Sequence, residues 1–140
     1  MEKKSEYKSI PPLVRKQVIQ AQRNEITEYH IYRRLARKVK TDKNRKILTS
    51  IAEDELRHYN TWMKYSGREV TPSNWDIFKY YWLAKLFGLS FSLKIMEKGE
   101  ERAQINFNEI GKEIPEALKI KDEENIHEKE LLAIINNKQL

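Results

Sequence analysis

Helix-breaking residues are scarce in this chain and stand mostly at the ends of long periodic runs. Only four prolines and four glycines occur among 140 residues. Pro11 and Pro12 precede the first run, and two later pairs, Gly67 with Pro72 and Gly111 with Pro115, each bracket a break. This punctuation leaves no room for β-strands, so the sequence predicts an all-α fold. Long helices are expected at 12–40, 42–66, 89–110 and 115–136, with a short extra helix at 75–87 between the second and the third.

The length of the chain suits one compact domain spanning 1–140, with frayed ends at 1–9 and 137–140. The absence of cysteine excludes disulfides, iron–sulfur clusters and thiolate-bound zinc, so strong metal ligands must be histidines and carboxylates. The net charge of +6 comes without a recognisable nucleic-acid-reading motif, and we expect no nucleic-acid partner. The N-terminus lacks an apolar signal segment, which predicts a cytoplasmic protein, with the cytoplasmic face of a membrane as an alternative.

Side chains at alternating steps of three and four share one face of a helix. In each expected long helix this seam is apolar towards its ends and ionisable in the middle. An unpartnered carboxylate inside a helix bundle is costly, and the basic residues fall away from the seams, so metal cations are the simplest compensation. The ionisable residues are Glu25 in the first helix, Glu55 and His58 in the second, Glu97 and Glu100 in the third, and Glu124 and His127 in the fourth.

Two Glu-x-x-His motifs sharpen this interpretation. Glu55 with His58, and Glu124 with His127, are spaced so that a carboxylate and an imidazole point the same way from one helix. One such motif arises easily by chance in a glutamate-rich sequence, but two motifs at seam centres, one in each half, favour a metal site. Glu25 and Glu55 also lie at similar depths, roughly 21 to 24 Å from the turn near Thr41 at 1.5 Å per residue.

Charge counting predicts two metal ions. Glu25, Glu55, Glu97 and Glu124 supply four negative charges, which two divalent cations neutralise, and each histidine adds one nitrogen ligand. Carboxylate and imidazole ligands suit iron or manganese, although zinc and cobalt also accept them. We therefore expect two iron ions, with manganese or zinc as possible substitutes.

The runs QRNEITEYHIYRRLA, IAEDELRHY and KIMEKGEERAQ resemble the ferritin-like di-iron carboxylate proteins of the rubrerythrin branch. They are most similar to the rubrerythrin-type domain that precedes membrane domains of the vacuolar-iron-transporter family. The likeness extends from about Leu13 to Ile135 and implies an antiparallel four-helix bundle. In transporters of that family, membrane helices begin where this chain stops, so we expect either a soluble fragment or a stand-alone relative.

The resemblance also implies ligand roles. Glu25 and Glu97 would each be a terminal ligand of one iron, and Glu100 would move with redox state. Glu55 and Glu124 would bridge the irons, and His58 and His127 would each bind one.

The implied function is a di-iron oxidoreductase that oxidises Fe(II) or reduces hydrogen peroxide or dioxygen. Because the four-cysteine rubredoxin module is missing, electrons would come from an external donor. The alternative is a non-catalytic iron-binding or sensing module that supplies or regulates a membrane iron or manganese transporter. We expect a homodimer in either case.

Three further features carry predictions. Tyr32 and Tyr59 are candidates for hydrogen bonding to the ligands, although a tyrosine near a bundle core more often simply packs there. The segment 74–87 is aromatic, basic and amphipathic, which favours an interface. We expect a second subunit there first, with a membrane surface as the alternative. The plainer interpretation is that it only caps the bundle.

Overall fold

The computed structural model describes residues 10–102 and 105–136, and at 97 and 99–102 it describes the backbone alone. Within these ranges the chain forms helices and no strand, which confirms the all-α prediction. The predicted fraying at 1–9 and 137–140 lies outside the described residues. The helices are α1 (Pro12–Ala36), α2 (Asp42–Ser66), α3 (Asn74–Phe87), α4 (Leu89–Arg102), α5 (Phe107–Glu113) and α6 (Glu116–Asn136).

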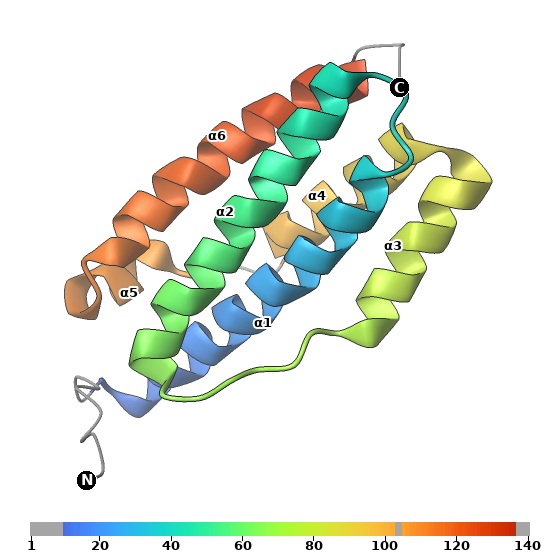
Figure 1. The fold of residues 1–140 in the computed structure, drawn as a ribbon. Helices are drawn as coiled ribbons and strands as arrows, with labels where there is room; N and C mark the ends of the chain where they lie inside the picture. Colours follow the sequence, from blue (N-terminus) through green and yellow to red (C-terminus); the bar gives the residue numbers. More distant parts are fainter. Residues whose placement is uncertain (1–9, 103–104, 137–140) are drawn as a thin grey trace, which may run out of the picture.

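Helices α1 and α2 form an antiparallel pair with well-defined ends (Figure 1). Proline occupies the first turn of α1, and the Thr41 side chain caps α2 by accepting a hydrogen bond from Asn44 N at 3.2 Å. Gly67 ends α2 with a positive φ of 74°, which glycine adopts without strain. The prediction that the first helix reaches residue 40 was wrong, because the chain leaves the helix after Ala36 and buries Val39 in the turn.

The short helix predicted between the second and third long helices is α3, and Gly88 separates it from α4. Gly88 has a φ of 93°, which side-chain-bearing residues rarely adopt. Ser73 caps α3 by accepting a hydrogen bond from Asp76 N at 3.3 Å. The hydroxyl of Ser92 donates to Tyr80 O at 2.7 Å and so ties α4 to α3.

The third long helix expected at 89–110 is not continuous. Helix α4 ends at Arg102, and α5 begins at Phe107. The Asn106 side chain caps α5 by accepting a hydrogen bond from Glu109 N at 3.2 Å, which gives the chain a local alternative to a longer helix. Gly111 lies inside α5, where a Cβ atom would come within 3.1 Å of Leu118 Cγ. Glycine therefore permits the close approach of α5 to α6.

Most of the buried apolar residues that the structure describes form two clusters. One includes Leu35, Leu48 and Leu93. The other includes Val18, Trp62 and Ile110.

Figure 1 shows α6 alongside α2, with α3 on the far side of α1. Contacts join α2 to both α1 and α6, and α4 to both α3 and α6. In the part of the chain that the structure describes, no helix has both the length and the apolar character needed to cross a membrane. The arrangement brings together Glu25 of α1, Glu55 and His58 of α2, and Glu124 of α6.

Candidate metal centre

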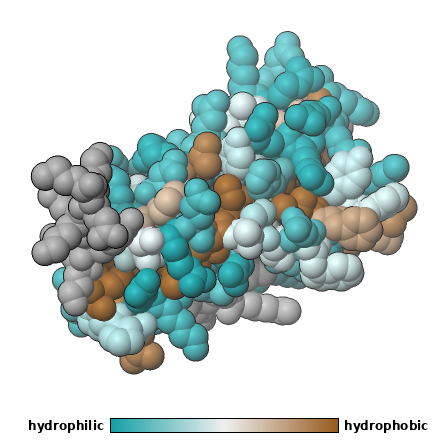
Figure 2. Space-filling model, turned by 60° about the horizontal axis from the view of Figure 1, so that its bottom comes forward, coloured by the Kyte–Doolittle hydropathy of each residue, from teal (hydrophilic) through white to brown (hydrophobic). Residues whose placement is uncertain are grey.

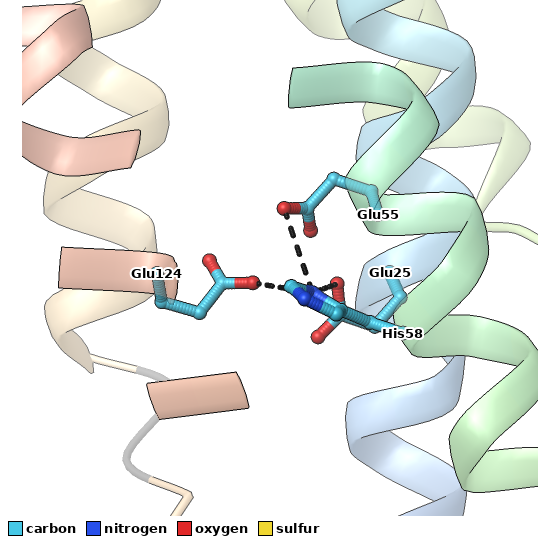
Figure 3. Close-up of side chains that lie close together, drawn as sticks. All are labelled: Glu25, Glu55, His58 and Glu124. Carbon is cyan, nitrogen blue, oxygen red and sulfur yellow. Dashed lines mark hydrogen bonds and ion pairs between the residues drawn. The ribbon is translucent and has the colours of Figure 1, made fainter. Parts of the chain in front are cut away.

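Three helices bring the predicted ligands together (Figure 3). Glu25 projects from α1, Glu55 and His58 from successive turns of α2, and Glu124 from α6. One ligand atom from each of these four residues lies within 4.8 Å of the others. Glu25, Glu55 and His58 are buried, and the side chain of Glu124 is 24% exposed. The structure therefore shows a cluster of the size and ligand type that a metal ion requires.

The Nδ1 atom of His58 is surrounded by carboxylates. It lies 3.1 Å from Glu124 Oε1 and 3.5 Å from Glu25 Oε2. Glu55 Oε1 is more distant, at 3.9 Å. Figure 3 shows these carboxylates pointing towards the imidazole from three sides. This nitrogen faces the interior of the cluster, as a metal-binding nitrogen would.

His127 of α6 occupies a related position opposite His58. Its Nδ1 atom lies 2.9 Å from Glu55 Oε1, and the two imidazole rings stack with centroids 6.0 Å apart. Glu55 therefore lies next to both histidines, with Glu124 beside His58. The two Glu-x-x-His motifs therefore lie next to each other between α2 and α6.

The outer nitrogens of both histidines contact carboxylates that the sequence analysis missed. His58 Nε2 lies 2.7 Å from Glu123 Oε2, and His127 Nε2 lies 2.8 Å from Asp54 Oδ2. Each acid comes from the helix opposite its histidine. A sequence signal was present, because Asp54 and Glu123 each stand directly before the glutamate of a Glu-x-x-His motif.

Arg57 connects these two outer acids. Its Nη2 atom donates to Asp54 Oδ1 at 3.2 Å and to Glu123 Oε2 at 2.5 Å. A continuous chain of contacts thus runs from His127 through Asp54, Arg57 and Glu123 to His58. Such outer partners fix the orientation of ligand imidazoles in metal sites.

The electrostatics of the cluster favour cations. Burial raises the pKa of Glu55 well above its ordinary value, and the charges of Glu25 and Glu124 raise it further. Burial also raises the pKa of Glu124. For His58, burial would lower the pKa, but the nearby carboxylates of Glu124 and Glu25 raise it to about 10. Burial of Glu55 and Glu124 thus disfavours their charged forms, and a nearby cation would offset that cost.

Several buried polar atoms of the cluster have no hydrogen bond. Both carboxylate oxygens of Glu55, one oxygen of Glu25 and Nδ1 of His127 have no hydrogen-bond partner, although His127 Nδ1 lies 2.9 Å from Glu55 Oε1. Orphaned groups of this kind cost about 1 to 3 kcal/mol each. All of these oxygen and nitrogen atoms can bind a metal ion. The donor set therefore fits divalent metal ions.

The outer acid Glu123 has the opposite electrostatic behaviour. Burial would raise its pKa, but hydrogen bonds from Arg57 and His58 lower it to about 2. Glu123 is consequently a permanent anion at neutral pH. Its carboxylate can accept a hydrogen bond from His58 Nε2. This bond orients the imidazole ring so that Nδ1 faces the cluster.

Four predicted site residues lie outside this cluster or outside the described side chains: Glu97, Glu100, Tyr32 and Tyr59. Glu97 and Glu100 belong to α4, but their side chains lie outside those that the structure describes. Tyr32 is buried in the apolar cluster around Leu35. Tyr59 hydrogen-bonds to the backbone of Val70, donating to its carbonyl at 3.3 Å and accepting from its N–H at 3.1 Å. These contacts secure the segment between α2 and α3.

Comparisons with protein-family models, with curated proteins and with solved structures found no match to this chain. The resemblance to the rubrerythrin branch therefore stays a prediction from the motifs. The structure itself shows an all-α fold and a buried Glu/His cluster among the described residues.

Proposed function

We propose that the Glu/His cluster binds two divalent metal ions, with iron as the native metal, and that the protein is a di-iron oxidoreductase of ferritin-like type. Its substrates would be Fe(II), hydrogen peroxide or dioxygen. The observation that carries the proposal is the set of buried ligand atoms of Glu25, Glu55 and His127 that have no hydrogen-bond partner. A folded protein tolerates such atoms in its core when a bound cation satisfies them.

The ligands divide naturally between two ions. His58, Glu25 and Glu124 would hold one, and His127 with Glu55 would begin the shell of the other. Glu55 is close to both histidines, which suits a bridging carboxylate. From their places in the sequence, Glu97 and Glu100 would complete the second shell from α4, making α1, α2, α4 and α6 a ferritin-like four-helix bundle.

The bound metal pair would supply two electrons at one place, which a single oxidant can accept in one step. The protein's own residues perform the remaining work. The buried carboxylates balance the charge of the ions, and the apolar clusters on the two sides of the site exclude bulk water. Asp54 and Glu123 hold the outer imidazole nitrogens, so that each Nδ1 lone pair is directed inward.

Anaerobic titration with Fe(II) followed by rapid mixing with dioxygen or peroxide tests this function. We expect saturation at two ions per chain and an absorbance change on oxidation that repeats over many cycles when reductant is supplied. The variant Glu55→Gln should lose binding, whereas Glu53→Gln, which changes an exposed acid on the same helix, should bind normally.

The possible outcomes separate the alternatives. No uptake of Fe(II), Mn(II) or Zn(II) would refute the metal centre. Uptake of two ions without turnover would replace the oxidoreductase with the metal-binding or sensing module. Turnover with only one of the two oxidants would identify that oxidant as the substrate.

A further inference from the structure

The outward face of α3 is apolar although it is exposed. Its large side chains recur at steps of three and four, which places them in one stripe along the helix. The stripe consists of Trp75, Phe78, Trp82 and Leu86, which are between 37% and 68% exposed. Ile77 and Ala84, on the opposite side of α3, are buried against the core. Helix α3 therefore packs through one face and presents a second apolar face to solvent.

The apolar surface continues past the end of α3. Phe87 and Phe91 are both exposed, and their rings lie 5.3 Å apart across the Gly88 break. In Figure 2, brown and near-white residues gather on the right, the side on which α3 lies in Figure 1. An exposed apolar patch of this kind marks an interaction surface.

Lysines border the stripe on both sides. By helical position, Lys79 lies on one flank of the stripe and Lys85 on the other. The Nζ atom of Lys85 lies 4.8 Å from the centre of the Trp82 ring, and that of Lys79 lies 4.6 Å from the Tyr80 ring. Lys38, in the turn that follows α1, places its Nζ 4.6 Å from the centre of the Tyr81 ring. The ammonium groups therefore stand beside aromatic rings along the length of α3.

Negative charge is scarce on this surface. Asp76 is the only acid in α3, and its carboxylate is 3.6 Å from Lys79 Nζ. A symmetric dimer through α3 would bring the lysines of two copies to one interface with few acids to pair them. An anionic lipid surface offers the complementary charge, with headgroups for the lysines and an acyl boundary for the aromatic stripe. The charge pattern thus favours lipid over a second copy of the chain.

We propose that the α3 stripe, together with Phe87 and Phe91, binds the surface of an anionic lipid bilayer. Helix α3 lies in the plane of the interface with its outward aromatic face in the headgroup and acyl boundary. This docking does not depend on the metal centre, because none of the ligand residues belongs to α3.

Vesicle flotation of the full 140-residue chain tests the proposal. The protein should float with phosphatidylcholine–phosphatidylglycerol vesicles and remain behind with phosphatidylcholine alone, and added salt should weaken binding. Emission from Trp75 and Trp82 should shift to the blue on binding, while the buried Trp62 contributes a constant background.

Variants separate the apolar and the electrostatic parts. Phe78→Ser with Leu86→Ser should reduce binding at least about tenfold. Lys79→Gln with Lys85→Gln should reduce binding to the anionic vesicles by about fivefold for each lysine. Leu132→Ser, an exposed apolar residue on α6, is the control and should bind as the parent chain does.

Circular dichroism would verify that each variant folds. Failure of the folded parent chain to float with anionic vesicles would overturn the proposal. Equal binding to neutral vesicles, unaffected by the lysine variants, would also overturn it. A concentration-dependent dimer that Phe78→Ser disrupts, without flotation, would assign the stripe to a second copy instead.

Discussion

Replacing Glu55 with glutamine should stabilise the metal-free protein and abolish its metal binding. Glu55 is only 1% exposed, and neither of its oxygens has a hydrogen-bond partner. Glutamine keeps the shape of the side chain and removes the buried charge. Its amide can donate to the unpaired oxygen of Glu25.

The magnitude follows from the cost of the orphaned carboxylate. Removing part of a penalty of about 1 to 3 kcal/mol should raise the free energy of unfolding by about 1 to 2 kcal/mol. At about 3 °C per kcal/mol for a domain of this size, Tm should rise by about 3 to 6 °C. In the presence of metal the order should reverse, because an ion at 100 times its Kd adds about 2.7 kcal/mol to the parent protein alone.

The pH dependence supplies a second check. Burial raises the pKa of Glu55, so the folded chain holds this proton more tightly than the unfolded chain does. The stabilisation from that proton is complete below the ordinary carboxyl pKa and is lost as pH rises towards the raised value. The advantage of Glu55→Gln over the parent should therefore grow as pH rises above the ordinary carboxyl pKa.

Thermal and urea unfolding of chelator-treated protein, with and without added Mn(II), measure both effects. Glu53→Gln is the matched control, because Glu53 is an exposed acid on the same helix, and its free energy of unfolding should stay within about 0.5 kcal/mol of that of the parent. Destabilisation of metal-free Glu55→Gln at every pH, with metal binding retained, would refute the reasoning and make Glu55 a structural residue.

Three further predictions concern the surroundings of the cluster. Arg57→Met should weaken Mn(II) binding by about tenfold in calorimetry, because Asp54 and Glu123 lose their shared cation, and unchanged affinity would contradict this. Metal affinity should rise with pH and binding should release protons, because the pKa of His58 is raised to about 10 and an ion must displace its proton. Calorimetry in buffers of different ionisation enthalpy measures the number of protons released. Thr41→Ala should lower the free energy of unfolding by about 1 kcal/mol in urea, whereas Thr41→Ser should keep the α2 cap.

Arg57 connects the buried histidines of the site to the surface of the protein through Asp54 and Glu123. Arg57 is half exposed, yet it joins the acids that contact both buried histidines. A change in the position of this one side chain would alter both imidazoles together. The outer acids therefore belong to the chemistry of the site as much as to the stability of α2 and α6.

Interactions between residues that are close in the sequence made most helix ends, and the side chains that share a helix face, predictable. Helix ends at Pro12, Thr41, Gly67 and Gly88 follow from backbone preferences that act within a few residues. The inward direction of Glu55 and His58 follows from helical spacing alone. The expected continuous helix at 89–110 failed because Asn106 offers a cap whose use depends on where α5 packs.

Tertiary structure decided what lies between helices. The sequence showed two Glu-x-x-His motifs, but only the packing of α2 against α6 shows that each histidine contacts the acid before the other motif's glutamate. It also shows that the aromatic stripe of α3 faces outward, since the same apolar pattern could equally have been buried. Spacing along a helix determines which side chains share a face, whereas their partners depend on the positions of the neighbouring helices, which are set by packing between distant segments.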